Sequence, residues 1–184
     1  MKRTCAPRAA RAIVQLGKLL LFCAAFGCGI QPASADEDFA GTVTRIFDGD
    51  SFLVRPAQGK DIDVRLLDID APEKNQPHGN DARAALVKLI GNRRVYVDVI
   101  DVDHYDRKIA RVYREPDRLD IARALVHDGH VWVYRRTVRD RSLIALEDTA
   151  KSSHLGLWAL PERERVPPWQ FRYLERKRKA GGQR

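Results

Sequence analysis

Short stretches of alternating apolar and polar residues follow one another between residues 42 and 113, a pattern typical of β-strands with one buried face. The clearest case is the range 62–67, where apolar residues alternate with charged ones. Between the first two stretches stands Asp48-Gly49-Asp50, which is typical of a hairpin turn. The pattern predicts strands over 42–47, 51–54, 62–67, 95–99 and 109–113.

Three further segments carry apolar residues at helical spacing, namely 81–90, 120–128 and 140–153. Asn80 is expected to cap the first helix and Gly91 to end it, while Asp120 and Asp140 are expected to cap the other two. Five short strands with about three helices favour an α+β fold in which a five-stranded OB-fold β-barrel has the helices packed outside. Other α+β folds share this pattern, so periodicity alone does not select the barrel.

Residues 1–35 are typical of a signal peptide, because a basic start precedes an apolar run over 19–30 and small residues around a cleavage site after Ala35. The apolar run has 12 residues, whereas a membrane-spanning helix needs about 20. An uncleaved anchor is the alternative, and a lipid anchor through Cys28 is disfavoured by the bulky Phe26 before it. We therefore expect a secreted or periplasmic protein without stable membrane association after signal cleavage. All three cysteines lie in this segment, so the mature chain has no thiol chemistry.

The formal charge of +8 is concentrated at the two ends of the chain. Residues 1–35 carry +5, residues 172–184 carry another +5, and the remaining residues 36–171 therefore carry −2. This distribution excludes a body that holds polyanions by bulk charge alone.

The mature chain divides by composition into a domain over 36–160, long enough for one core, and an extension over 161–184. Pro161, Pro167 and Pro168 exclude a continuous helix through the extension, while its aromatic residues are expected to pack back on the barrel. The basic run 176–179 and the glycines after it predict disorder. Whether this tail is merely solvated or makes a weak polyanion contact stays open. We expect a monomer.

Three polar clusters carry candidate chemistry: DGDS at 48–51, RLLDIDAPE at 65–73 and DHYDR at 103–107. The second brings one guanidinium and three carboxylates to the end of an apolar strand, where a cation or an anionic ligand would compensate their charges. Taken singly, each cluster is also compatible with an ordinary polar turn or a solvated loop.

Taken together, and in this order and spacing, the three clusters resemble the thermonuclease family of staphylococcal-nuclease-like domains. Residues 129–136, the sequence LGLW at 155–158 and PPW at 167–169 are similar to C-terminal features of its secreted bacterial members, so the resemblance spans 41–169. It implies an OB-fold barrel and a calcium-dependent nuclease. Such an enzyme hydrolyses DNA and RNA with little sequence preference, favours single strands and leaves 3'-phosphate ends.

The resemblance also implies the roles of individual residues. Asp50 and Asp70 would be the carboxylate ligands of Ca²⁺, and the backbone carbonyl of Ala71 a third ligand. Oxygen ligands of this kind suit a hard divalent cation. With two protein carboxylates, we expect weak binding until a phosphate adds an oxygen of its own.

Glu73 matches the family's general base, and Arg65 and Arg107 match the pair that grips the phosphate. Two cations and a metal would neutralise the charge that grows on the phosphate oxygens during attack by water. Tyr105 and Tyr134 are candidates for stacking on bases. Packing in the core is the alternative for Tyr134, as it is for Trp132, and a helix end rather than a zinc site is favoured for His127 with His130.

Two departures from the family pattern leave alternatives open. Asp106 stands beside Arg107 where many relatives have glycine, and Asp68 adds a carboxylate near the expected metal as a candidate outer ligand. These allow a catalytic domain with another metal or a narrower substrate, and a non-catalytic OB-fold module that binds nucleic acid or protein is a further alternative. The mechanism also has a geometric requirement. Arg65 and Asp70 are five residues apart, so the regular strand must be broken near Asp68 to bring both to one side.

Overall fold

The computed structural model describes residues 37–182, so the expected signal peptide over 1–35 lies outside the described part of the chain. The strands are β1 (Phe39–Ile46), β2 (Ser51–Pro56), β3 (Ile62–Leu66), β4 (Ile69–Asp70), β5 (Arg94–Val102), β6 (Lys108–Arg114), β7 (Leu119–Asp120) and β8 (Trp132–Val133). The helices are α1 (Gly79–Ile90), α2 (Ile121–His127), α3 (Ser142–Ser152) and α4 (Pro168–Gly181), with 3-10 turns η1 (Gly156–Ala159) and η2 (Glu162–Glu164).

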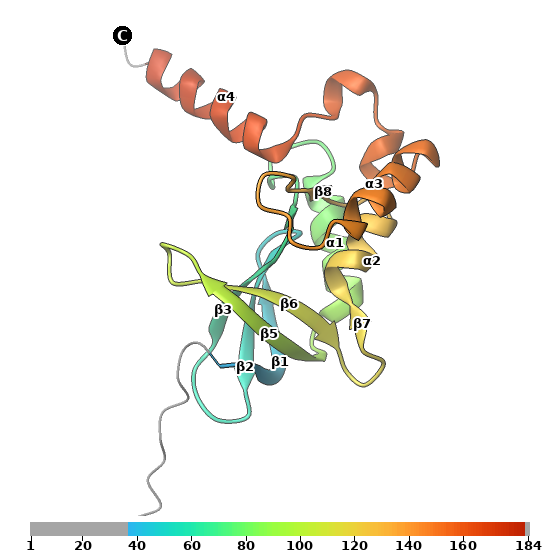
Figure 1. Cartoon of the computed structure of the whole chain (residues 1–184). Coiled ribbons are helices and arrows are strands. Elements are labelled where there is room, and N and C mark those ends of the chain that lie inside the picture. Colours follow the sequence, from blue (N-terminus) through green and yellow to red (C-terminus); the bar gives the residue numbers. More distant parts are fainter. Residues whose placement is uncertain (1–36, 183–184) are drawn as a thin grey trace, which may run out of the picture. The chain divides into compact units, whose positions relative to one another are not determined.

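Five strands close into a barrel (Figure 1). Antiparallel neighbours follow the order β3-β2-β1-β5-β6, and a parallel pairing of β3 with β6 joins the two ends. In that pairing Arg65 lies opposite Ile109, which brings the end of β3 next to the start of β6. The prediction of an α+β fold with a five-stranded OB-fold barrel is confirmed. The part of the chain in the structure has four α-helices, one more than the sequence pattern predicted.

The barrel interior is filled by the apolar residues that alternate along the strands. Those with at most 1% exposure include Val43, Phe52, Val54, Val64, Leu66, Val95, Val97, Ala110 and Val112. Shifts in register between Val43 and Arg45 and between Val99 and Asp101 bend β1 and β5, as closure of a small barrel requires. The alternation in the sequence thus specifies the faces of the long strands.

Helices α1, α2 and α3 lie beside one another on one side of the barrel (Figure 1). Gly91 follows α1 and Asp120 caps α2 by accepting from the Arg123 amide, both as predicted. The prediction of Asn80 as the first cap was wrong. The α1 helix begins at Gly79, after His78 in a left-handed conformation and without a side-chain cap. The α3 helix begins at Ser142, whose amide donates to Asp140.

The prediction of disorder for residues 176–182 was wrong, because α4 continues to Gly181. Pro168 lies in its first turn, where backbone amides have no acceptor within the helix, so the missing N–H of proline costs no hydrogen bond. Trp169 then packs edge-on against Trp132 and Tyr134, with ring centroids 6.0 and 5.5 Å apart. This aromatic cluster fixes the start of the helix, in agreement with the prediction that aromatic residues of the extension pack on the domain. Tyr173, in contrast, is exposed.

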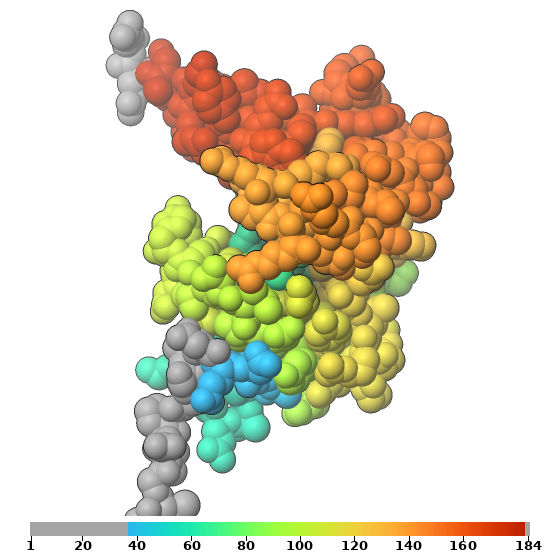
Figure 2. All heavy atoms as spheres, viewed as in Figure 1, coloured from blue at the N-terminus to red at the C-terminus, as the bar shows by residue number. Residues whose placement is uncertain are grey.

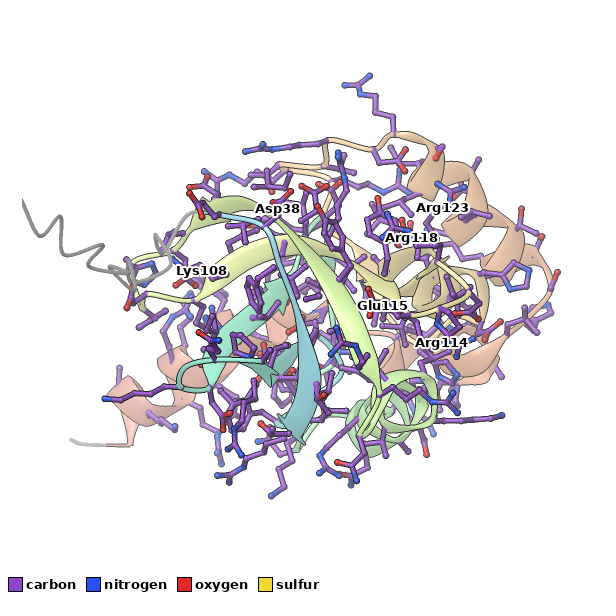
Figure 3. The ribbon with its side chains drawn as sticks, turned by 90° about the horizontal axis from the view of Figure 1, so that it is seen from below. Asp38, Lys108, Arg114, Glu115, Arg118 and Arg123 are labelled. Carbon is purple, nitrogen blue, oxygen red and sulfur yellow. The ribbon has the colours of Figure 1, made fainter. Side chains whose placement is uncertain are left out.

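Figure 3, seen from below, shows the curved strands around the side chains of the interior, with Arg114, Glu115 and Arg118 on the β6–β7 side. The Arg118 guanidinium lies 4.9 Å from the ring centroids of both Tyr96 and Tyr113. These contacts stabilise the β6–β7 turn. Over residues 37–182, no helix has the length and apolar character needed to cross a bilayer.

Candidate active site

A cleft of about 670 Å³ opens between the end of β3, the β5–β6 turn, the loop after β8 and α4. Figure 2 shows the surface hollowed between the tip of the β5–β6 hairpin and α4. The cleft is lined by candidate residues from the sequence that include Arg65, Asp68, Asp70, Glu73, Tyr105, Arg107 and Tyr134. Asp50 and Ala71 are buried beneath it, next to Arg65 and Asp70.

The β1–β2 turn delivers Asp50 to this place. The Asp48 carboxylate accepts from the amides of Asp50 and Ser51 at 3.0 and 2.8 Å, which closes the turn in the usual way for aspartate. A Cβ at Gly49 would lie 2.8 Å from the Ala71 Cβ, so only glycine lets the turn approach the 71–73 segment this closely. Asp50 Oδ2 then accepts from the Ala71 amide at 2.7 Å.

Arg65 joins the two aspartates. Its Nη1 donates to Asp50 Oδ1 and its Nη2 to Asp70 Oδ1, each at 2.7 Å. The break in alternation that this contact requires occurs at Asp68, which leaves the strand conformation with φ of 67° before β4 begins. The two carboxylates therefore converge on one guanidinium.

Burial raises the pKa of Asp50 to about 6, against the opposing effect of the Arg65 charge and with a smaller contribution from the Asp48 charge. Burial also lowers the pKa of the Arg65 guanidinium, but the charges of Asp50 and Asp70 more than offset it, so the pKa is raised. The two buried carboxylates therefore depend on nearby cations.

Glu73 follows Pro72 in a compact loop that Gln76 holds. The backbone amide of Gln76 donates to the Glu73 carbonyl at 2.9 Å, and the side-chain Oε1 of Gln76 accepts from the Glu73 backbone amide at 3.1 Å. The other end of the Gln76 side chain donates to the Val166 carbonyl, just before α4. A Cβ at Gly79 would lie 1.9 Å from the Glu73 carbonyl oxygen, so this loop also needs a glycine at the start of α1.

Arg172 of α4 reaches the same carboxylates from the opposite side. Its Nη1 donates to Glu73 Oε1 at 2.7 Å and to Asp70 Oδ1 at 3.1 Å, and its Nη2 donates to Asp70 Oδ2 at 2.8 Å. Burial lowers the pKa of Arg172, but the hydrogen bonds to Asp70 and Glu73 outweigh burial, so the pKa is raised overall. The sequence pattern did not reveal this residue, because it stands in the segment that composition assigned to a tail.

Arg107 is held by Asp103 at the β5–β6 turn. The Asp103 Oδ2 accepts from Arg107 Nε at 2.9 Å and from Nη2 at 2.7 Å, and its Oδ1 accepts from the Arg107 amide at 3.0 Å. Partial burial raises the pKa of Asp103, but the hydrogen bonds from Arg107 and the Tyr105 amide lower it below its ordinary value. Tyr105 is 70% exposed, and its ring lies 5.4 Å from the Arg107 guanidinium. Asp106 is exposed and has a left-handed φ of 65°, a conformation that suits glycine.

Asp68 does not point toward the proposed metal ligands, contrary to its expected place as an outer ligand. Its carboxylate accepts from the amides of Arg139 at 2.7 Å and Asp140 at 2.9 Å, and its carbonyl accepts from the Tyr134 amide. Asp68 therefore holds the loop after β8, and with it the side of the cleft that Tyr134 lines.

His127 and His130 do not form a pair. His127 contacts Asp128 at the end of α2, whereas His130 lies 3.0 Å from His78, with the two rings stacked. Trp132 packs against Trp158 and Trp169, in agreement with a role in packing.

The residues predicted to hold a cation fit one by their donor chemistry. Within 37–182 no three His, Cys, Asp or Glu side chains form a metal-binding group. Two buried carboxylates and the Ala71 carbonyl nevertheless form an all-oxygen set of the kind that hard cations take. The carboxylate oxygens accept from Arg65, Arg172, Ser51 and the Ala71 amide, so a bound cation would compete with these donors.

The chain matches the model of a family described as staphylococcal nuclease homologue over residues 63–160. It is 35% identical to Protein ParB of Escherichia coli over 173 residues, which covers 89% of this chain and 96% of that relative. It is also 35% identical to a micrococcal nuclease of Shigella flexneri, covering 73% of this chain and 81% of the relative. An uncharacterized endonuclease of Escherichia coli O157:H7 is 34% identical, with 74% and 86% covered. Extended similarity of this kind, over the same strands that carry the cleft, shows that the chain belongs to the staphylococcal nuclease homologue family.

Proposed function

We propose that this protein is an exported, calcium-dependent nuclease that hydrolyses DNA and RNA with little sequence preference and favours single strands. Its family and its relatives named as nucleases support a nuclease function. The observation that carries the proposal is that Arg65, Asp70, Glu73 and Arg107 line one cleft. Sequence positions 65 and 107 are brought to this cleft by the parallel pairing of β3 with β6.

The chemistry assigned to each side chain follows from its position. Arg65 and Arg107 bind the non-bridging oxygens of the phosphate, and their positive charges stabilise the negative charge that develops there. Glu73 orients a water molecule and accepts its proton as the phosphorus is attacked. Asp103 fixes the direction of the Arg107 guanidinium, since it holds both Nε and Nη2. The proton then returns to the leaving oxygen, which yields two shorter strands.

Asp50, Asp70 and the carbonyl of Ala71 would hold Ca²⁺. When bound there, the cation supplies positive charge beside the phosphate and lowers the electrostatic cost of attack. Both aspartates are 2% exposed, so their charges are poorly screened by water and attract a cation, which must compete with the guanidinium groups of Arg65 and Arg172.

Digestion of single-stranded DNA by the purified mature chain tests this proposal. We expect cleavage with calcium, none with a chelator, and a fall in kcat of about 10²- to 10⁴-fold for Glu73→Gln, because a general base contributes about this much. Glu162→Gln, an exposed residue of η2, serves as the matched control and keeps full activity. Equal activity in all arms would contradict the mechanism, and tight binding without cleavage would favour the non-catalytic module instead.

We further propose that the mature domain begins at Asp36, comprises residues 36–160 with an extension over 161–184, and acts as a monomer. The basic, apolar and small-residue order of residues 1–35 supports export to the periplasm or beyond. N-terminal sequencing of the protein recovered from the producing cells checks this. A start at Asp36 is expected, and a start at Met1 would contradict export.

A further inference from the structure

One face of α4 continues the cleft with basic side chains. Arg172, Arg176 and Lys179 follow one another at helical spacings of four and three residues, so they share one face of the helix. Arg172 and Arg176 line the main cleft. A second hollow of about 250 Å³ is lined by Arg172, Arg176 and Lys179 together with Glu73. Because Glu73, Arg172 and Arg176 line both hollows, the second hollow adjoins the cleft at the candidate catalytic glutamate, and we call the two together the path.

Two of these cations are available to a ligand. Arg176 and Lys179 are exposed, and within residues 37–182 neither side chain has an ion-pair or hydrogen-bond partner. Other cations of α4 are engaged elsewhere, since Lys177 lies 4.9 Å from the Tyr173 ring and Arg178 pairs with Glu175 at 3.1 Å. The available charge of the helix is therefore concentrated on the side that faces the path.

The helix that carries these residues is fixed at its beginning. Trp169 packs on Trp132 and Tyr134, Gln76 bonds to the Val166 carbonyl, and Arg172 pairs with Asp70 and Glu73. Arg176 stands one turn beyond Arg172, and Lys179 almost one turn further. These contacts give the two free cations a defined position relative to the cleft, which a solvated tail would not have.

We propose that Arg176 and Lys179, here called the α4 basic face, bind the phosphates of a single-stranded nucleic acid next to the phosphodiester that lies in the cleft. The inference rests on the proposed nuclease function and adds to it an extended contact along the substrate. Charge complementarity and continuity with the cleft identify a polyanionic strand as the occupant. Since the rest of the domain carries a slightly negative charge, such placed cations supply attraction that bulk charge does not.

Fluorescence anisotropy with labelled oligodeoxythymidine tests the proposal, with Glu73→Gln present in every chain so that cleavage is slow on the time scale of the measurement. One probe of about 12 nucleotides spans the cleft and α4, and one of about 3 nucleotides fills the cleft alone. For Arg176→Gln/Lys179→Gln we expect Kd for the longer probe to rise roughly tenfold at low salt. The slope of log affinity against log salt should fall by about 1.4, because two phosphate contacts on a single strand are lost. The shorter probe should lose less affinity, because Lys179 does not line the cleft.

Lys177→Gln/Arg178→Gln is the matched control, because it removes the same two charges from other sides of the same helix. We expect this double variant to change Kd by about twofold or less, through general electrostatics alone. Equal losses in the two double variants, an unchanged affinity for the longer probe, or an equal loss for the shorter probe would each overturn the proposal.

Anionic phosphatidylglycerol vesicles provide a further arm, because exposed Tyr173 and Leu174 on α4 also suit a lipid surface. If the Arg176→Gln/Lys179→Gln variant loses vesicle binding but keeps its affinity for the longer probe, the basic face belongs to a membrane contact and the proposal is wrong. Cleavage by the chain with Glu73 intact is measured separately. If that chain cuts no nucleic acid while the anisotropy differences persist, the nuclease proposal fails and the α4 contact stands.

Discussion

The guanidinium of Arg172 donates to the carboxylate of Glu73 at 2.7 Å, although 99 positions separate the two residues. The same guanidinium holds both oxygens of Asp70. A C-terminal helix thus places a positive charge beside a proposed general base and a proposed metal ligand.

This contact predicts the effect of Arg172 on cation binding. Arg172→Gln removes a positive charge next to Asp70, so we expect the affinity for Ca²⁺ to rise about tenfold, as expected for one charge at a few ångströms in a partly exposed site. Isothermal titration calorimetry of the protein without nucleic acid measures this. Arg163→Gln, whose side chain is 84% exposed and pairs with Glu164, is the control and should leave the affinity unchanged. An unchanged or weaker affinity in Arg172→Gln would show that Arg172 and the cation do not compete.

Asp68 is expected to matter for stability and not for the metal. Asp68→Ala leaves the amides of Arg139 and Asp140 without their acceptor and places alanine at a left-handed φ. We expect the free energy of unfolding in urea to fall by about 2 to 4 kcal/mol. Asp68→Asn keeps one acceptor and tolerates this backbone, so it should lose about half as much. A change in Ca²⁺ affinity in Asp68→Asn beyond twofold would restore the outer-ligand interpretation.

Substitutions of Asp106 separate the effect of its backbone conformation on stability from the effect of its charge on substrate binding. Asp106→Gly removes the cost of a left-handed φ of 65° in the folded chain, but glycine also raises the conformational entropy of the unfolded chain. Because the two effects oppose each other, we expect the free energy of unfolding to change by about 0.5 kcal/mol or less. Asp106→Val should destabilise by about 1 to 2 kcal/mol. Asp106→Asn removes the charge beside Arg107 and should lower KM for single-stranded DNA about twofold at low salt, an advantage that disappears at high salt. A KM that does not respond to salt would contradict an electrostatic cause.

The stacked pair of His78 and His130 predicts a loss of stability in acid. Burial lowers the pKa of both rings, with Asp81, Asp128 and Lys88 as the charged groups around them. In the unfolded chain both histidines bind protons at the ordinary pKa near 6.5, whereas in the folded chain they bind protons only at lower pH. Because the unfolded chain then binds more protons, the free energy of unfolding should fall as pH falls below about 6.5.

His78→Asn tests this dependence, because asparagine tolerates the φ of 69° at this position. Urea unfolding between about pH 5 and 7.5 should show a shallower pH dependence for His78→Asn than for the unaltered chain. His154→Asn, at an exposed position with a left-handed φ of 51°, is the control for the substitution itself. Parallel curves for the unaltered chain and His78→Asn would mean that the pair does not govern acid stability.

Regular periodicity made the long strands predictable. Residues 62–66 alternate over a whole strand, and the barrel buries Val64 and Leu66 as this alternation requires. Strands β4 and β8 have two residues each, too few for any period, and they exist because Ile69 pairs with Val133 far along the chain. Local pattern therefore identified the barrel strands but not the two-stranded sheet beside the cleft.

The site shows the same division. The DGDS and RLLDIDAPE sequences were assigned to one place through the family resemblance that their joint order and spacing carry, and the left-handed Asp68 supplies the break that Arg65 and Asp70 need. Arg172 lay in the extension over 161–184, whose prolines excluded a continuous helix and whose basic run at 176–179 predicted disorder just beyond it. Its helix depends on tertiary contacts of Trp169 and of Arg172 itself, which no local propensity reveals.

The parallel pairing of β3 with β6 makes the cleft depend on closure of the barrel. Arg65 and Arg107 are separated in the sequence by α1 and β5, and this pairing places the end of β3, with Arg65, beside the start of β6, next to Arg107. An unfolded chain has the same side chains but does not hold them together in a cleft. Opening of the β3–β6 pairing would therefore separate the side chains that line the cleft even if every strand kept its own conformation.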